Sequence, residues 1–198
     1  QLLKSIQTRE EYKGNLGVLN NVWYTSRDNG KTWQYHAQVD PTHEHAVLIG
    51  RNLLTHKGLT YFAAWSRHQG NALYVSTDNV RSWRRRSVIF PTTYPDFNGL
   101  SKGGPPFYPG VEFLDDGTLL AISYHTPPEN ACYIRTSQDQ GRTWGPINKR
   151  SELDVWAPRL SKIADGVLMV TGRSIKEHAT VAIFSTDDGR TWGDQLIL

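Results

Sequence analysis

One octapeptide occurs four times in the chain, and this repeat constrains the fold more than any other feature of the sequence. The copies follow the pattern S-x-D-x-G-x-[ST]-W, except that the second has Val80 in place of glycine. Their Asp positions are Asp28, Asp78, Asp139 and Asp187, which are 50, 61 and 48 residues apart. Recurrence at this interval indicates that each copy belongs to one repeated structural unit.

The residue types of the octapeptide are those of a tight turn between antiparallel strands. Short Ser and Asp side chains satisfy turn amides, and glycine tolerates positive φ. The Trp is expected to anchor the turn by burying its ring against a neighbouring sheet. We therefore assign the four Asp residues to structure rather than to catalysis. Because β-branched Val80 resists positive φ, we expect the second turn to be distorted or of another type.

The segments around the octapeptides predict strands, and helix signal is negligible. We expect an all-β chain forming a β-propeller of four-stranded antiparallel blades, with blades at about 1–40, 41–92, 105–150 and 153–198. In the first blade, the strand at 18–26 leaves no room upstream for an inner strand, so about three and a half blades are expected. The other predicted strands are 46–49, 59–66, 73–76, 85–90, 111–114, 118–124, 132–137, a short return near 147, 159–163, 167–172, 180–185 and 195–198.

The octapeptides resemble the Asp box of the sialidases and related BNR-repeat proteins. Residues 108–121 and 156–170 look like the inner two strands of sialidase blades, and the resemblance spans nearly the whole chain. It implies a six-bladed propeller, so the chain is expected to be either a fragment or part of a ring that a second copy closes. It also implies a carbohydrate partner, although the same box occurs in sialidases, polysaccharide lyases and non-enzymatic propellers.

Candidate site residues lie where equivalent strand ends converge around the propeller axis. Aligning the repeats places His45, Tyr108 and Ala157 just before inner strands, and residues 67–68, 124–125 and 173–174 at the ends of second strands. Such a basin suits an acidic sugar, because cations bind a carboxylate and flat rings stack on pyranose faces. The predicted catalytic residues are His45, His68, Tyr108 and His125, and the predicted substrate-binding residues are His43, Arg67, Tyr124, Trp156 and Arg173. Three histidines, His36, His56 and His178, are assigned to outer segments or turns.

Three functions remain open for this basin. An exo-sialidase type of glycoside hydrolase is expected first; it requires an arginine cluster, to which Arg159 and Arg173 are the available contributors, and a Tyr nucleophile. The family's Arg-Ile-Pro segment is absent from the chain. An eliminative lyase acting on a uronate glycan is the second, because His45, His68 and Tyr108 resemble the His-His-Tyr set of such enzymes, although Tyr124 stands where they carry Arg. A non-catalytic glycan-binding propeller is the third.

Composition argues against several other classes of protein. Cys132 is the only cysteine and the histidines lack metal-ligand spacing, so we expect no intrachain disulfide, metal or cofactor. Net charge is +3, and the basic cluster formed by Arg81 and 84–86 has no interleaved aromatic platform, which argues against a nucleic-acid partner. No apolar run reaches the length of a membrane span. The start at Gln1 lacks an initiator Met, and we favour a secreted or periplasmic location.

Overall fold

The computed structural model describes residues 2–9, 19–38, 47–66, 70–91, 107–125 and 131–198, and this part of the chain folds entirely into β-structure. It forms four antiparallel sheets, here called blades 1 to 4. Blade 1 contains β1 (Leu2–Arg9), β2 (Leu19–Ser26) and β3 (Gln34–Gln38). Blade 2 contains β4 (Val47–His56), β5 (Leu59–Ser66), β6 (Gly70–Ser76) and β7 (Arg84–Phe90). Blade 3 contains β8 (Phe107–Phe113), β9 (Leu119–His125), β10 (Ala131–Ser137) and β11 (Asn148–Arg150). Blade 4 contains β12 (Trp156–Ala164), β13 (Val167–Ser174), β14 (Ala179–Ser185) and β15 (Leu196–Ile197).

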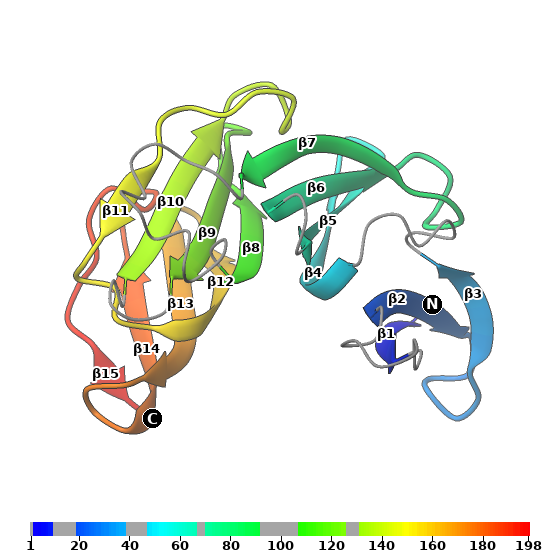
Figure 1. Cartoon of the computed structure of the whole chain (residues 1–198), viewed down its shortest axis with the longest axis horizontal. Coiled ribbons are helices and arrows are strands. Elements are labelled where there is room, and N and C mark those ends of the chain that lie inside the picture. Colours follow the sequence, from blue (N-terminus) through cyan, green and yellow to red (C-terminus); the bar gives the residue numbers. More distant parts are fainter. Residues whose placement is uncertain (1, 10–18, 39–46, 67–69, 92–106, 126–130) are drawn as a thin grey trace, which may run out of the picture.

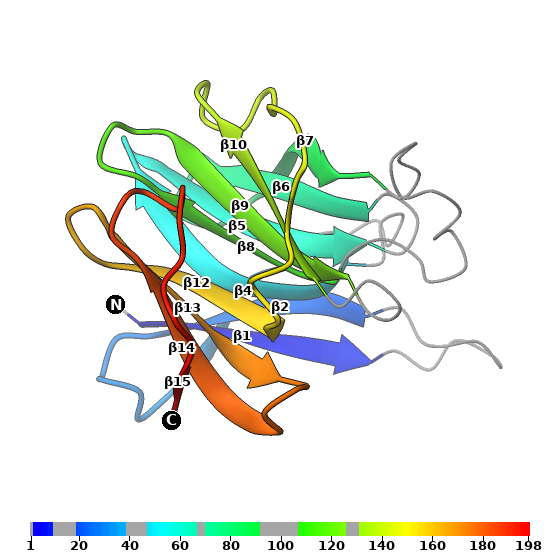
Figure 2. The ribbon, with the colours of Figure 1, turned by 90° about the vertical axis from the view of Figure 1, so that its left-hand side faces the viewer.

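The blades are arranged as an open arc with blade 1 at one end and blade 4 at the other (Figure 1). Within blades 2, 3 and 4 the strands follow in sequence order, and the first strands β4, β8 and β12 are neighbours on the concave side of the arc. The side view in Figure 2 shows that blades 2 and 3 lie face to face. The prediction of an all-β propeller with four-stranded antiparallel blades is therefore confirmed.

Blade 1 differs from the other blades in its strand content. Its octapeptide lies between β2 and β3, whereas the octapeptides of blades 2 to 4 lie between the third and fourth strands. The three described strands of blade 1 therefore correspond to the second, third and fourth strands of a complete blade. Sequence reasoning anticipated an incomplete first blade but did not identify β1, whose run Leu2–Arg9 shows only weak alternation.

An apolar cluster fills each junction between neighbouring blades. Blades 1 and 2 meet where Trp23 packs edge-on against Phe62, with ring centroids 5.3 Å apart. A second cluster joins blades 2 and 3, and a third joins blades 3 and 4, where Ile134 and Leu168 are almost completely buried. Burial of apolar surface between sheets is the main stabilising term for such an arrangement. The blades are therefore held together by their faces.

The Ser and Asp side chains of the octapeptide turns are satisfied within each turn, as the structural interpretation predicted. In blade 4, Ser185 Oγ donates to Asp187 Oδ1 at 2.8 Å and accepts from Gly189 N at 2.8 Å. Thr191 N and Oγ1 both donate to Asp187, at 2.8 and 2.6 Å. The Thr191 hydroxyl first, then its amide and Ser185, lower the pKa of Asp187 to about 2. Equivalent bonds form in the other three copies.

Val80 occupies a turn of the same type as its glycine counterparts, so the prediction of a distorted turn is wrong. Its φ is 68°, against 81° for Gly141, and its amide donates to Ser76 Oγ at 2.9 Å as the glycine amides do to their serines. The Val80 side chain is 2% exposed within the cluster that joins blades 1 and 2. Burial of its methyl groups offsets the cost of a left-handed backbone, which is about 1–3 kcal/mol.

The octapeptide turns of blades 2, 3 and 4 also contact the blade before them. Trp144 Nε1 donates to Ser87 Oγ at 2.9 Å, and Ser87 Oγ donates to Gly141 O at 2.5 Å. These bonds fasten the blade 3 turn to β7 of blade 2, and Arg135 adds further bonds to the carbonyls of Gly145 and Ile89. Between blades 1 and 2, His36 Nε2 lies 3.0 Å from Asn79 O. The turns are thus inter-blade fasteners as well as strand connections.

Candidate functional site

The candidate site lies at the end of the blade opposite to the octapeptide turn. In blade 4, Ser185 at the turn pairs with Leu168, whereas Arg173 pairs with Trp156 on one side and Thr180 on the other. Five residues along β13 separate the two ends, which corresponds to roughly 17 Å. The repeat motif therefore leaves the opposite end of each sheet available for other chemistry.

Near the starts of β8 and β12, at this end, one residue in each strand adopts the left-handed conformation. Tyr108 has φ 58° at the start of β8, and Ala157 has φ 57° at the start of β12. The pairing with the next strand is irregular at both places, between Phe107 and Gly110 and between Trp156 and Arg159. Non-glycine residues with positive φ cost about 1–3 kcal/mol and cluster at functional sites. The two residues occupy equivalent positions, as the repeat alignment proposed.

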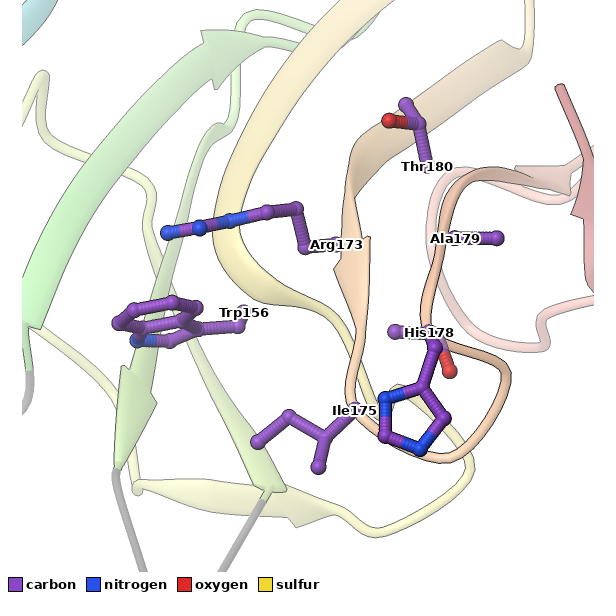
Figure 3. Close-up of a pocket in the computed structure, with 7 residues that line it drawn as sticks. Trp156, Arg173, Ile175, His178, Ala179 and Thr180 are labelled. Carbon is purple, nitrogen blue, oxygen red and sulfur yellow. The ribbon is translucent and has the colours of Figure 1, made fainter.

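A cavity of about 340 Å³ lies at this end of blade 4. It is formed by the start of β12, the end of β13, the start of β14 and the turn between β13 and β14 (Figure 3). Its lining residues are Trp156, Arg173, Ser174, Ile175, His178, Ala179 and Thr180. They combine one cation, one indole, one imidazole and two hydroxyl groups in a small open hollow.

Arg173 lies across the face of Trp156, with its Cζ 3.8 Å from the ring centroid. Figure 3 shows the guanidinium extended over the indole. Arg173 is exposed, and its guanidinium makes no hydrogen bond or ion pair within the described part of the chain. A guanidinium stacked on a ring keeps its N–H donors at its edge, where they fit a planar carboxylate. The stack therefore orders the cation without consuming its donors.

Trp156 is positioned from a second blade as well. The ring of Tyr108 meets it edge-on, with centroids 6.4 Å apart and an interplanar angle of 80°. Tyr108 comes from β8 of blade 3 and Trp156 from β12 of blade 4. The structure thus brings together three of the predicted site residues, Tyr108, Trp156 and Arg173, at the junction of two blades.

Sequence reasoning left His178 out of the site. The prediction that His178 lies on a turn holds, but that turn forms a wall of the cavity. Two hydrogen bonds hold the turn: Glu177 N donates to Ser174 Oγ at 3.1 Å, and Lys176 N donates to Asp154 Oδ2 at 3.4 Å. The position of His178, five residues after Arg173, was the available signal, because a short turn returns the chain to the same strand end.

The sequence matches the BNR repeat-like domain family over residues 60–196. The chain belongs to the BNR repeat-like family. No curated protein sequence matches this BNR chain. Its fold is similar to that of an α-L-arabinofuranosidase from Clostridium thermocellum, at 14% identity and a TM-score of 0.69, over 98% of this chain and 72% of that protein.

Two further solved structures have a fold similar to that of the BNR chain. One is an α-L-arabinanase from Penicillium chrysogenum complexed with arabinobiose, at 18% identity and TM-score 0.57, over 76% of this chain and 49% of that protein. The other is a mutant of NanB sialidase from Streptococcus pneumoniae, at 16% identity and TM-score 0.60, over 94% of this chain and 30% of that protein. The BNR chain thus spans about half the length of the arabinanase and less of the sialidase.

Two predicted site residues of the BNR chain lie in its core. Tyr124 is fully buried in the cluster between blades 3 and 4, and burial raises the pKa of its hydroxyl to about 12. His125 is 1% exposed, and its ring lies edge-on to Tyr133 at 6.3 Å. The structure therefore does not bring Tyr124 or His125 to the cavity. The remaining predicted residues, His43, His45, Arg67 and His68, lie outside the described residues.

Cysteine and metal chemistry find no support in the described residues. Cys132 is buried, and burial raises the pKa of its thiol well above its ordinary value, so the reactive thiolate is disfavoured. In the same part of the chain, no group of three His, Cys, Asp or Glu side chains is arranged to hold a metal ion. No helix there is long and apolar enough to cross a membrane.

Proposed function

We propose that this BNR propeller is a carbohydrate-active protein of the glycoside hydrolase type, and that it binds an acidic glycan at the cavity around Trp156 and Arg173. The proteins with similar folds include an arabinofuranosidase, an arabinanase with bound arabinobiose and a sialidase, which supports a carbohydrate ligand. An exo-sialidase activity is the specific form of this proposal.

The guanidinium of Arg173, which is stacked on Trp156 and has no hydrogen bond or ion pair among the described residues, carries the proposal. A neutral sugar needs only hydroxyl contacts and a flat ring, whereas a carboxylate-bearing sugar gains a charge-assisted and often bidentate bond from arginine. Thr180 and His178 line the same cavity and supply further polar contacts. Tyr108 supports Trp156 from the adjacent blade.

One observation favours the alternatives of an eliminative lyase or a non-catalytic glycan-binding propeller. Among the described residues that line the cavity, none carries a carboxyl group. Glycoside hydrolysis generally uses Asp or Glu as the proton donor, whereas elimination can use His and Tyr, and binding alone needs neither. The same cavity is therefore compatible with hydrolysis, with elimination and with binding alone, and these three hypotheses are distinguished by the product formed or by its absence.

The test measures products and affinity together. The protein is incubated with sialosides, with uronate oligomers and with neutral arabino-oligosaccharides, while released sialic acid and the ultraviolet absorbance of unsaturated uronate are followed. Sialic acid release supports the sialidase form, unsaturated uronate supports the lyase, and saturable calorimetric binding without product supports the binding propeller. Binding only of neutral oligosaccharides would overturn the acidic-glycan proposal.

Arg173→Gln tests the residue itself, with Arg190→Gln as the matched control. Arg190 is also exposed but lies in the octapeptide turn at the other end of blade 4. Loss of one charge-assisted contact, worth about 1.5–3 kcal/mol, should weaken binding of the acidic glycan at least about tenfold. The Arg190 variant should bind like the parent protein. Equal weakening by both variants would indicate a general charge effect instead of a specific site.

A further inference from the structure

One face of the Trp156 indole is already covered by a side chain of the same blade. Arg173 Cζ lies 3.8 Å from the ring centroid, which is van der Waals contact, so no sugar ring fits between the two groups. The indole is otherwise half-buried against the apolar cluster between blades 3 and 4, and Tyr108 meets it edge-on. In the described structure, Arg173 therefore lies where a sugar would stack on the ring (Figure 3).

The repeated unit does not require an arginine at this position. Counted by strand pairing from the turn serines, Trp65 in blade 2 and Tyr124 in blade 3 hold the register position of Arg173. Both residues are aromatic, so a four-stranded blade forms here without a cation. The charge of Arg173 is thus a property of blade 4 and its cavity, and the fold of the blade does not explain it.

A guanidinium that lies on an indole discriminates between acidic and neutral sugars. Its N–H donors point outward in the plane of the group, where they pair with a carboxylate. A neutral sugar gains no ion pair, finds no free ring face for stacking, and displaces water from a cation without supplying a charged partner. The stack therefore attracts an acidic sugar and also withholds the aromatic surface from a neutral one.

We propose that Arg173 is a specificity-determining residue that excludes neutral sugars by covering the Trp156 ring, in addition to pairing with the carboxylate of an acidic sugar. The inference rests on the proposed function, because it concerns the same cavity. It adds one consequence that a carboxylate contact alone does not have. Removal of the arginine should create affinity for neutral sugars as well as weaken the binding of acidic ones.

Two substitutions separate the cover from the charge. Arg173→Ala removes both and exposes the indole face, whereas Arg173→Met removes the charge but keeps an unbranched side chain that can lie over the ring. Arg190→Ala, at the turn end of blade 4, is the matched control. The probes are sialyllactose and a uronate trimer, each paired with its neutral methyl ester. Calorimetry measures the Kd of each probe, and melting temperatures verify folding.

The two Arg173 variants should behave alike toward acidic probes and differently toward neutral ones. Both should bind the acidic probe that the parent protein binds at least about tenfold more weakly. Arg173→Ala alone should bind the corresponding methyl ester more tightly than the parent protein, by about tenfold, which corresponds to burial of roughly 60 Å² of apolar surface. Adding Trp156→Ala to Arg173→Ala should abolish this gain, and Arg190→Ala should bind every probe like the parent protein.

The outcomes distinguish failure of this inference from failure of the proposed function. If Arg173→Ala gains no affinity for the ester, or if Arg173→Met gains as much as Arg173→Ala, the inference is overturned and the acidic-glycan proposal stands. If the parent protein binds each ester as tightly as its acid, both are overturned. A lowered melting temperature of Arg173→Ala with unchanged ligand preference would also overturn the inference, because the stack would then belong to the scaffold.

Discussion

The two ends of blade 4 differ in how their polar groups are satisfied. At the turn end, the Asp187 carboxylate accepts hydrogen bonds from Ser185 and Thr191. At the other end, the Arg173 guanidinium lies on the Trp156 ring without a hydrogen bond or ion pair in the described structure, beside the strained backbone of Ala157. Groups that are saturated internally hold a fold together, whereas an ordered but unsaturated group is available to a ligand.

The same contrast separates equivalent residues in neighbouring blades. Tyr124 and Arg173 hold the same register position at the ends of β9 and β13, where they pair with Cys132 and Thr180. Blade 4 covers Tyr124, which is fully buried, whereas Arg173 is exposed at the cavity. Equivalent register positions in the two blades therefore differ in burial, with a tyrosine at the buried position and an arginine at the exposed one.

The largest expected difference between the ends is in stability. Trp144 packs against the cluster between blades 2 and 3 and donates to Ser87, so Trp144→Ala should lower the free energy of unfolding by about 3 kcal/mol. Trp156 is likewise half-buried against the cluster between blades 3 and 4, but its ring has no comparable hydrogen bond to another blade among the described residues. Trp156→Ala should therefore cost less stability than Trp144→Ala and should also weaken glycan binding. Urea unfolding and calorimetric titration of both variants measure the two effects. If Trp156→Ala proves as destabilising as Trp144→Ala, then Trp156 is part of the scaffold.

Lowering the pH should reduce stability by protonating the Asp carboxylates at the turn end. Hydrogen bonds from Thr or Ser side chains lower the pKa values of Asp28, Asp78 and Asp187 to about 2. Since these folded-state values lie below the unfolded value of about 3.9, their stabilisation is complete above about pH 5 and is lost as pH falls toward 2. Each contribution is modest because the groups are exposed. Melting temperatures recorded from pH 6 to pH 2 should show this decline.

Thr191→Val sharpens the acid experiment. The Thr191 hydroxyl is the largest cause of the lowered pKa of Asp187, so its removal should raise that pKa and begin the acid-induced loss of stability at higher pH. Arg190→Gln, one residue away, keeps the hydroxyl and serves as the comparison. An acid profile of Thr191→Val that coincides with that of the parent protein would contradict the assignment of the turn carboxylate.

Repetition explains why the fold was predictable from sequence and much of the site was not. The four octapeptides fix the third and fourth strands of every blade, and their alignment correctly equated Tyr108 with Ala157. Exposure, however, depends on the neighbouring blade, and local sequence does not reveal that Tyr124 is covered. Local sequence also did not reveal that His178 lies at the cavity, because only the folded turn brings it near Arg173. The roles of His43, His45, Arg67 and His68 stay predictions.

The blade 2 turn, which has Val80 in place of glycine, allows a test of the turn end with a smaller expected effect. Val80→Gly removes a β-branched residue from φ 68° but also empties a buried position between blades 1 and 2. Loss of the packed side chain costs about 2–3 kcal/mol, and relief of the backbone strain returns about 1–2 kcal/mol, so a net destabilisation of about 1 kcal/mol is expected. Thermal unfolding measures it, and a clear gain in stability would show that backbone strain outweighs packing at this turn.

The smallest expected effect is at the cavity end, where substitution by glycine should raise the stability of the protein instead of lowering it. Ala157 holds φ 57° at the start of β12, so Ala157→Gly should stabilise the protein by up to about 1 kcal/mol through release of left-handed strain. Ala121→Gly, at a buried position within β9, should instead destabilise by about 1 kcal/mol. If the strain holds Trp156 and Arg173 in place, Ala157→Gly should also weaken glycan binding while it raises the melting temperature. A variant that gains stability and binds with unchanged affinity would separate the strained backbone from the site.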